Sequence, residues 1–225
     1  MKLLAVDTAL GACSAALLDG DAVLAHELVV MERGHAEALA PMVQSLMQKA
    51  AMPFAEVDRL AVTTGPGTFT GQRVGLAFMR GLRVALRRPL IGITTLEAMA
   101  AAAMAETGAP FAAVLHDAKR DEVYGALYRR DDVLLSPTLL PFDEAVDAIA
   151  SKMDSNDSPV VFAGTAASDA AEHYARWGGT ATVTNIVHPD ALWVGRLAMR
   201  KPDCDAPPKP LYLRPPDARL PQKSA

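Results

Sequence analysis

Apolar residues at the start of the chain come in short runs separated by polar turns. Runs over residues 3–6, 13–18 and 23–30 are divided first by a polar turn and then by the pair Asp19-Gly20. Asp-Gly between two apolar runs favours a two-residue hairpin. The pattern therefore predicts three antiparallel strands at the beginning of the fold.

Helical spacing follows these strands. From residue 35 to residue 51 the apolar positions return at steps of three and four, which predicts a helix with one apolar face. After a predicted buried strand over 60–64, residues 71–87 form a second helix that is apolar on more than one side. One sheet covers only one side of such a helix, so the pattern predicts that another helix packs against it.

The segment from Gly65 to Leu82, GPGTFTGQRVGLAFMRGL, joins the strand to this second helix. Its first glycines, Gly65, Gly67 and Gly71, permit tight turns and a close approach of other backbone. A strand, a glycine-rich loop and a helix N-terminus can also present N–H groups to an anion, although no Gly-Lys-Ser/Thr follows. Two interpretations stay open: a tight connection packed against a neighbour, or a loop that meets a ligand or partner. With the two-sided helix behind it, we interpret the segment as a docking element.

The second half of the chain repeats the first. Asp7 and Asp117 each end an apolar strand, and each is followed by a short polar turn and a strand that contains Ala-Leu. The simplest explanation of this repeat is an internal duplication. Further strands are predicted at 89–93, 111–116, 122–128, near 133, at 159–163 and at 180–184, with helices at 95–106, 142–152, 167–177 and 189–199.

The predicted organisation is two subdomains and a tail. We expect subdomains over residues 1–106 and 107–205, followed by a tail over 206–225. Proline is concentrated at this end of the chain, which favours an extended segment. The tail is predicted to be docked or mobile, with Tyr212-Leu-Arg214 as its anchor.

Composition describes a globular chain. Of 225 residues 51% are hydrophobic and 21% are charged, and the net charge of −4 argues against a bulk electrostatic nucleic-acid binder. Two cysteines make no disulfide framework and indicate a reducing compartment. No apolar run approaches the roughly 20 residues of a membrane span, and Asp7 interrupts an N-terminal stretch that otherwise resembles a lipoprotein signal. We therefore expect a cytoplasmic protein that does not bind membranes.

Four arginines fall on one narrow face of the second helix. Arg73, Arg80, Arg83 and Arg87 are spaced by 7, 3 and 4 residues. Such a stripe is either a solvated face or a surface that meets phosphates or carboxylates, for example those of tRNA or of an acidic partner.

The two predicted halves, each of βββαβα type and opening with strand, Asp, turn and strand, resemble the actin/hexokinase superfamily. The resemblance implies an α/β actin-like ATPase fold (ASKHA, RNase H-like) with two duplicated subdomains, the second one degenerate. In that superfamily the two Asp-bearing turns face each other across a cleft and handle phosphates and a divalent metal. The resemblance therefore implies a vestigial phosphate or nucleotide cleft, with these candidates: Asp7, Thr8, Gly65, Gly67, Asp117 and Lys119.

GPGTFTGQRVGL, together with LLAVDTALGACSAAL, DAKRDEVY and the closing Tyr212-Leu-Arg214, resembles the bacterial TsaB (YeaZ) family, also described as Gcp-like or glycoprotease-like. Members are non-catalytic partners of TsaD in forming N6-threonylcarbamoyladenosine next to the anticodon of tRNAs that read ANN codons. The resemblance implies a homodimer when the chain is alone and a TsaB–TsaD heterodimer in the working complex. It also implies that the ATPase TsaE binds at the TsaB–TsaD junction, that TsaC supplies threonylcarbamoyl-adenylate, and that tRNA is met through the complex.

The helices 35–51 and 71–87 are the surface that this resemblance implies for both dimers, because side by side they can form half of a four-helix bundle. The candidate interface residues are the apolar and small ones of the two helices: Leu39, Met42, Val43, Leu46, Val74, Phe78, Gly81 and Leu82.

The catalytic relative TsaD carries His-Met-Glu-Gly-His on the helix after its fifth strand, and two histidines at i and i+4 can hold a metal ion. The matching stretch here is Thr95-Leu96-Glu97-Ala98-Met99, in which both histidine positions are lost. We therefore expect no metal, no catalytic residue and no cofactor beyond weak ATP or ADP binding within the complex. The alternative function is a small ATP-binding phosphotransferase or ATPase of the actin-like superfamily.

Overall fold

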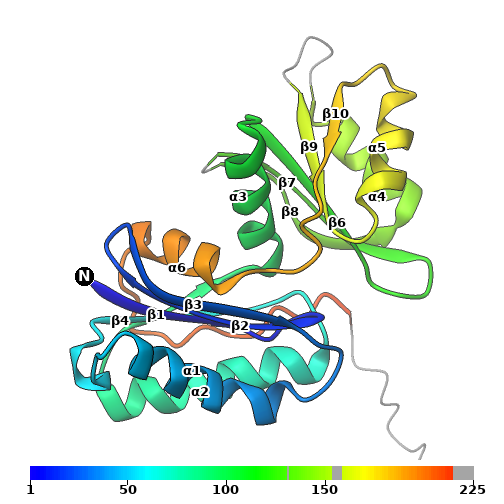
Figure 1. Cartoon of the computed structure of the whole chain (residues 1–225). Coiled ribbons are helices and arrows are strands. Elements are labelled where there is room, and N and C mark those ends of the chain that lie inside the picture. Colours follow the sequence, from blue (N-terminus) through cyan, green and yellow to red (C-terminus); the bar gives the residue numbers. More distant parts are fainter. Residues whose placement is uncertain (131, 154–158, 215–225) are drawn as a thin grey trace, which may run out of the picture.

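The computed structural model describes residues 1–130, 132–153 and 159–214 of the chain. Two five-stranded sheets, each flanked by helices, make up the molecule (Figure 1). The first sheet has the order β3-β2-β1-β4-β5. Its strands are β1 (Lys2–Asp7), β2 (Ala12–Asp19), β3 (Ala22–Val30), β4 (Arg59–Thr63) and β5 (Leu90–Ile93).

The second sheet repeats this topology. Its order, β10-β9-β6-β7-β8, equals that of the first sheet when it is taken from the other edge. The strands are β6 (Phe111–Asp117), β7 (Glu122–Arg129), β8 (Asp132–Pro141), β9 (Val160–Ala163) and β10 (Ala181–Val183). In both sheets the first three strands are antiparallel and the last two run parallel to the first. The duplicated α/β architecture predicted from the sequence is confirmed.

Three helices follow the strands of each half. They are α1 (His35–Lys49), α2 (Phe69–Leu86) and α3 (Thr95–Thr107) in the first half, and α4 (Phe142–Ala150), α5 (Ala167–Ala175) and α6 (Ala191–Arg200) in the second, with a short 3-10 turn η1 (Phe54–Glu56) before β4. None of the helices in the described ranges is long and apolar enough to cross a membrane.

The last helix of each half packs on the sheet of the other half. Helix α6 lies on the first sheet, where Ala191, Val194 and Ala198 join a core with residues of β1 and β2. Helix α3 contributes Leu96 and Met99 to the core that it shares with β6, β7 and β9. Figure 1 shows α6 above the first sheet, opposite α1 and α2. The predicted subdomain limits 1–106 and 107–205 therefore need correcting: by packing, α6 belongs with the first sheet and α3 with the second.

The remaining helices cover the other face of each sheet. Helices α1 and α2 pack side by side on the first sheet over a core that includes Leu4, Leu60 and Met79. Helices α4 and α5 do the same on the second sheet around Phe162. The inner strands of each sheet are thus buried on both faces, which explains why β1, β4, β6 and β9 are continuous apolar runs rather than alternating ones.

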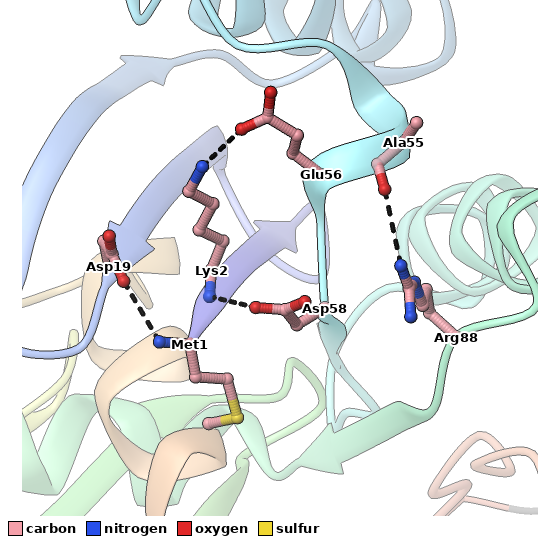
Figure 2. A network of polar contacts seen from close by, with 7 residues as sticks. All are labelled: Met1, Lys2, Asp19, Ala55, Glu56, Asp58 and Arg88. Atoms are coloured by element: carbon pink, nitrogen blue, oxygen red, sulfur yellow. Dashed lines mark hydrogen bonds and ion pairs between the residues drawn. The ribbon is translucent and has the colours of Figure 1, made fainter.

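Polar contacts hold the start of β1 against the turn before β4 (Figure 2). The backbone N–H of Lys2 donates to the Asp58 carboxylate at 2.8 Å, and the Lys2 ammonium pairs with Glu56. The N-terminal ammonium group pairs at 3.0 Å with Asp19, which ends β2 beside the start of β1. Because β1 is the central strand of the first sheet, these contacts fix the strand that carries Asp7 at its far end.

Candidate functional site

The glycine-rich loop packs against the turn that follows β1. A Cβ atom on Gly67 would lie 2.3 Å from the carbonyl oxygen of Ala9, and one on Gly71 would lie 2.2 Å from that of Thr8. The hydroxyl of Thr8 donates to the Gly71 carbonyl at 2.7 Å and accepts from the Gly75 N–H at 3.0 Å. The interpretation as a tight connection is therefore confirmed, and the neighbour that these glycines approach is the chain's own turn rather than a partner.

The beginning of α2 is capped within the chain. The side chain of Thr68 caps the helix by accepting from the Gly71 N–H at 3.1 Å, and the Thr68 N–H donates to the Ala9 carbonyl at 2.8 Å. The amide of Gln72 donates to the Gly67 carbonyl at 3.0 Å. These bonds commit much of the loop's hydrogen-bonding capacity to holding α2 on the turn.

Asp7 is a buried structural group. Its Oδ1 accepts from the Thr63 hydroxyl at 2.6 Å and from the Ala9 N–H at 3.1 Å. Burial raises the pKa of this carboxyl to about 7, although both hydrogen bonds act in the opposite direction. The pattern is that of an aspartate that caps its own turn.

Asp117 occupies the equivalent turn of the second half and, like Asp7, accepts from the N–H two residues further along, but it lies at the surface. Its Oδ1 accepts from the Lys119 N–H at 2.7 Å, and its Oδ2 pairs with the Lys119 ammonium at 2.7 Å. These contacts with Lys119 hold the pKa of Asp117 below its usual value. The Asp117 N–H donates to the hydroxyl of Thr165 at 2.8 Å, which ties this turn to the segment after β9.

A cavity of about 1210 Å³ lies between the two halves, but it contains only part of the predicted cleft. Gly67, Asp117 and Lys119 line it, whereas the lining does not include Asp7, Thr8 or Gly65. For these three residues the predicted cleft position is wrong, because the Asp7 turn is filled by the glycine-rich loop. Further lining residues, which were not predicted to lie at the cleft, come from both halves and the tail: Arg73, His116, Tyr124, His188, Tyr212 and Arg214.

Burial disfavours the charged form of both histidines at this cavity. Burial lowers the pKa of His116 to about 4, and His188 beside it acts in the same direction. Burial also lowers the pKa of His188 itself. Within the described ranges, no group of three or more His, Cys, Asp and Glu side chains is placed to hold a metal ion.

The arginine stripe of α2 holds the C-terminal segment. The Arg73 guanidinium lies 3.4 Å from the centre of the Phe69 ring and donates to the Tyr212 hydroxyl at 2.8 Å. Arg80 donates to the carbonyl of Pro208, and Arg83 to that of Asp205. Neither interpretation offered for this stripe, a solvated face or a tRNA or acidic-partner face, included these contacts within the chain, and the partner face stays a prediction. Arg87 is exposed at the C-cap of the helix.

Residues 203–214 tie the two halves together. Near the start of this segment Asp203 pairs with Arg59 at 2.5 Å, and further on the Leu211 N–H donates to the Thr64 carbonyl at 2.7 Å. At the end the Arg214 guanidinium donates to the carbonyl oxygens of Ala118 and Lys119 and pairs with Glu122. The predicted anchor at Tyr212-Leu-Arg214 is confirmed; the rest of the predicted tail, residues 215–225, lies outside the described residues.

Four of the eight candidate interface residues belong to the hydrophobic core under the first sheet. These four face the sheet and are almost fully buried: Leu39, Met42, Val43 and Leu46. A side chain that is already buried in the single chain has no surface to give to a partner, so the assignment of these four to an interface is wrong. On α2 the interface candidates Val74, Phe78 and Leu82 are half-buried against the same core, and Gly81 is exposed.

The outward side of α2 nevertheless carries an apolar stripe. It consists of Ala77, Gly81, Val84 and Ala85, all of which are exposed. Val84 is 74% exposed, and a Cβ on Gly81 would meet nothing within 4 Å. We refer to these four residues as the α2 stripe. Their steps of three and four place them on one face, and their small size lets another helix come close.

The helix position that holds histidines in TsaD is part of the packing here. Thr95 and Met99 are buried in α3. Glu97 forms a capping box with Thr94 and pairs with Lys201 at 2.9 Å, so its carboxylate ties α3 to the end of α6. The one acidic residue that remains from the metal motif therefore has a structural role.

Comparison with known proteins identifies the family. Residues 29–187 match the family described as TsaD, tRNA N6-adenosine threonylcarbamoyltransferase. A Pseudomonas aeruginosa crystal structure, of an uncharacterized protein with similarity to peptidase YEAZ, is 32% identical with a TM-score of 0.80, over 95% of this chain and 99% of that one. The chain belongs to the TsaB (YeaZ) family.

Two further matches define how far the family likeness extends. The Escherichia coli tRNA threonylcarbamoyladenosine biosynthesis protein TsaB is 39% identical over 132 residues, which is 59% of this chain and 57% of that protein. The ROK hexokinase of Thermus thermophilus, at 18% identity and a TM-score of 0.52, covers 88% of this chain and 98% of its own and shares the fold. The actin-like fold inferred from the two Asp-bearing turns is confirmed.

Proposed function

We propose that this chain is a non-catalytic subunit of the system that forms N6-threonylcarbamoyladenosine on tRNAs reading ANN codons, and that it acts by docking a TsaD protein. The likeness to TsaB proteins of Escherichia coli and Haemophilus influenzae and the match to the TsaD-type family support this pathway. The observation that carries the docking role is the α2 stripe, an apolar helix surface that the chain itself leaves uncovered.

The composition of the α2 stripe suits a helix as the docked element. Gly81 and the two alanines leave room for a second backbone, and Val84 is the largest side chain of the α2 stripe. Burying such a side chain contributes roughly 1.5–3 kcal/mol. A TsaD helix pair packed on α1 and α2 would form a four-helix bundle, and a second copy of this chain would use the same surface when TsaD is absent.

The remaining partners follow from this arrangement. TsaE would bind at the junction that TsaD and this chain form, and TsaC would supply threonylcarbamoyl-adenylate to TsaD. The tRNA would meet the assembled complex rather than the arginines of α2, because three of those arginines hold residues 205–212. The assembly would work in the cytoplasm, where its tRNA substrates are.

Reconstitution tests the proposal. TsaC, TsaD, TsaE, tRNA, threonine, bicarbonate and ATP are combined with and without this chain, and modified adenosine is measured. Modification should require the chain, and a full rate without it would refute the subunit role. A chain carrying Val84→Asp should restore little activity, whereas Val133→Asp, at a valine that is also exposed, should restore it fully.

A small ATPase or phosphotransferase remains the alternative. The observation in its favour is the cavity of about 1210 Å³, which Gly67, Asp117 and Lys119 line. Against it stands Asp7, whose buried carboxyl and internal hydrogen bonds leave it away from that space. Calorimetric titration with ATP and Mg²⁺ decides: weak or no binding supports the subunit role, and micromolar binding with turnover supports the enzyme.

A further inference from the structure

Strand β3 forms one edge of the first sheet, and within the described residues no strand pairs with its outer side. The sheet order ends with β3, which pairs with β2 alone. Exposed large apolar residues are concentrated on this strand, and Val30 is 67% exposed; the set is Val23, Leu24, Leu28, Val29 and Val30. A long apolar edge strand offers its free N–H and C=O groups to another strand.

The equivalent strand of the second half is protected. Strand β8 contains Pro137, and its pairing with β7 shifts register at two places. Proline and irregular pairing are devices that prevent an edge strand from adding another strand. In β3 the register shift leaves Leu24 unpaired, but from Ala25 to Val30 the pairing is regular and includes no proline or glycine. The duplicated fold thus protects one edge and leaves the other open.

Hydrogen bonds of β3 determine which residues can pair outward. The Met31 N–H donates to the Gly11 carbonyl on the β2 side at 3.0 Å. Because the direction alternates along an antiparallel strand, the backbone groups of His26, Leu28 and Val30 point away from β2. These three residues are the ones available to a sixth strand.

We propose that a second copy of this chain docks along β3 as an antiparallel strand, with Leu28 opposite Leu28 of the second copy. This register pairs His26 with Val30 and Glu27 with Val29, so every pair contains an apolar side chain. A register centred on Glu27 would oppose two carboxylates, which is destabilising. A register centred on His26 would bring the unpaired Leu24 into the ladder. Strand β3 can therefore pair with β3 of a second copy in the register centred on Leu28, and for this reason we take a second copy as the partner at this edge.

The rest of the fold is compatible with this pairing. Strand β3 runs parallel to β1, toward the end of the sheet where Asp7 and the cavity lie. A two-fold axis through Leu28 therefore places the second halves of the two copies at opposite ends of the joined sheet. Helix α2 packs over β4, β1 and β5, so the α2 stripe stays free for another partner.

A set of variants isolates this contact. Val84→Asp disables the α2 stripe, so any self-association that remains has another cause. By sedimentation equilibrium the Val84→Asp chain should be a dimer, and adding Leu28→Lys should halve its mass. Adding Val183→Lys instead, at an exposed valine of the edge strand β10, should leave the dimer intact. Circular dichroism confirms that each variant is folded.

Cysteine pairing gives a second readout that does not depend on disrupting the contact. Opposed residues in a hydrogen-bonded antiparallel pair have Cα atoms about 5.5 Å apart, within the reach of a disulfide. In a Cys204→Ser background, which removes the exposed native thiol, Leu28→Cys should form a covalent dimer on mild oxidation and Val183→Cys should not.

Three results would overturn the proposal. They are a Val84→Asp chain that is monomeric at all concentrations, a dimer that survives Leu28→Lys, and a Leu28→Cys chain that does not cross-link. If the Val84→Asp chain were monomeric, the occupant of the β3 edge would have to be a strand of another protein. None of these readouts involves TsaD, so the docking role of the α2 stripe succeeds or fails separately.

Discussion

Two glycines of α2 should respond in opposite ways to the same substitution. Gly71 lies at the start of the helix, where an added Cβ would come within 2.2 Å of the Thr8 carbonyl oxygen and 2.6 Å of the Thr68 hydroxyl. Gly81 lies further along the helix on the exposed side, with nothing within 4 Å of an added Cβ. The pair Gly71→Ala and Gly81→Ala therefore measures how closely α2 is held on the Asp7 turn.

The expected magnitudes follow from these surroundings. Alanine is favoured over glycine in a helix by about 1 kcal/mol, which Gly81→Ala should gain in full. Gly71→Ala must push the helix away from backbone, and such overpacking costs about 1–3 kcal/mol. It also weakens the bond from the Thr8 hydroxyl to the Gly71 carbonyl, worth about 1 kcal/mol. The two variants should differ by about 2–4 kcal/mol in free energy of unfolding.

Thermal unfolding followed by circular dichroism at low protein concentration is the assay. For a chain of this size 1 kcal/mol corresponds to about 2–4 °C in Tm. Gly81→Ala should unfold a few degrees above the parent and Gly71→Ala clearly below it. If Gly71→Ala were as stable as Gly81→Ala, the close contact between the loop and the Asp7 turn would be refuted.

Three further changes test other parts of the structure. Leu39→Ala should lower the free energy of unfolding by about 2–5 kcal/mol, measured in urea, because it opens a cavity in the core. Val84→Ala, at an exposed position, should change it little, and equal effects of the two variants would contradict the burial of Leu39. Arg214→Ala should speed the cleavage of the C-terminal segment by chymotrypsin at Tyr212, and an unchanged rate would contradict its anchoring role. Burial raises the pKa of Asp7 to about 7, so the folded chain binds that proton more tightly and its stability falls as pH rises from about 4 to about 7. Asp7→Asn should therefore be more stable than the parent near pH 8 by urea unfolding and should lose that advantage near pH 4; a constant difference would argue against the raised pKa.

The elements of the fold could be predicted from local pattern. Apolar runs and the Asp19-Gly20 turn locate the first hairpin, and the repeat of strand, Asp and turn reveals the duplication. The exchange of α3 and α6 between the halves could not be predicted, because the apolar face of a helix shows that it is buried but not which sheet covers it.

The site was predicted less well, for reasons that particular residues make clear. Leu39 and Val43 have the spacing of a buried face, and the sequence does not distinguish a face buried by the chain's own sheet from one buried by a partner. The arginines of α2 form a stripe, as expected, but Arg80 and Arg83 donate to backbone carbonyls more than 100 residues away, in a segment without periodicity. Ala77, Val84 and Ala85 were not among the candidates, since only the folded chain shows which side of α2 stays uncovered.

The account rests most on the docking of TsaD through the α2 stripe, and one binding experiment tests it directly. Calorimetry compares the affinity of a TsaD protein from the same organism for the parent chain, for Val84→Asp and for the control Val133→Asp. A buried, unpaired carboxylate costs at least about 3 kcal/mol, so Val84→Asp should weaken binding by 100-fold or more while the control binds like the parent. Equal affinity of all three chains would contradict the central claim.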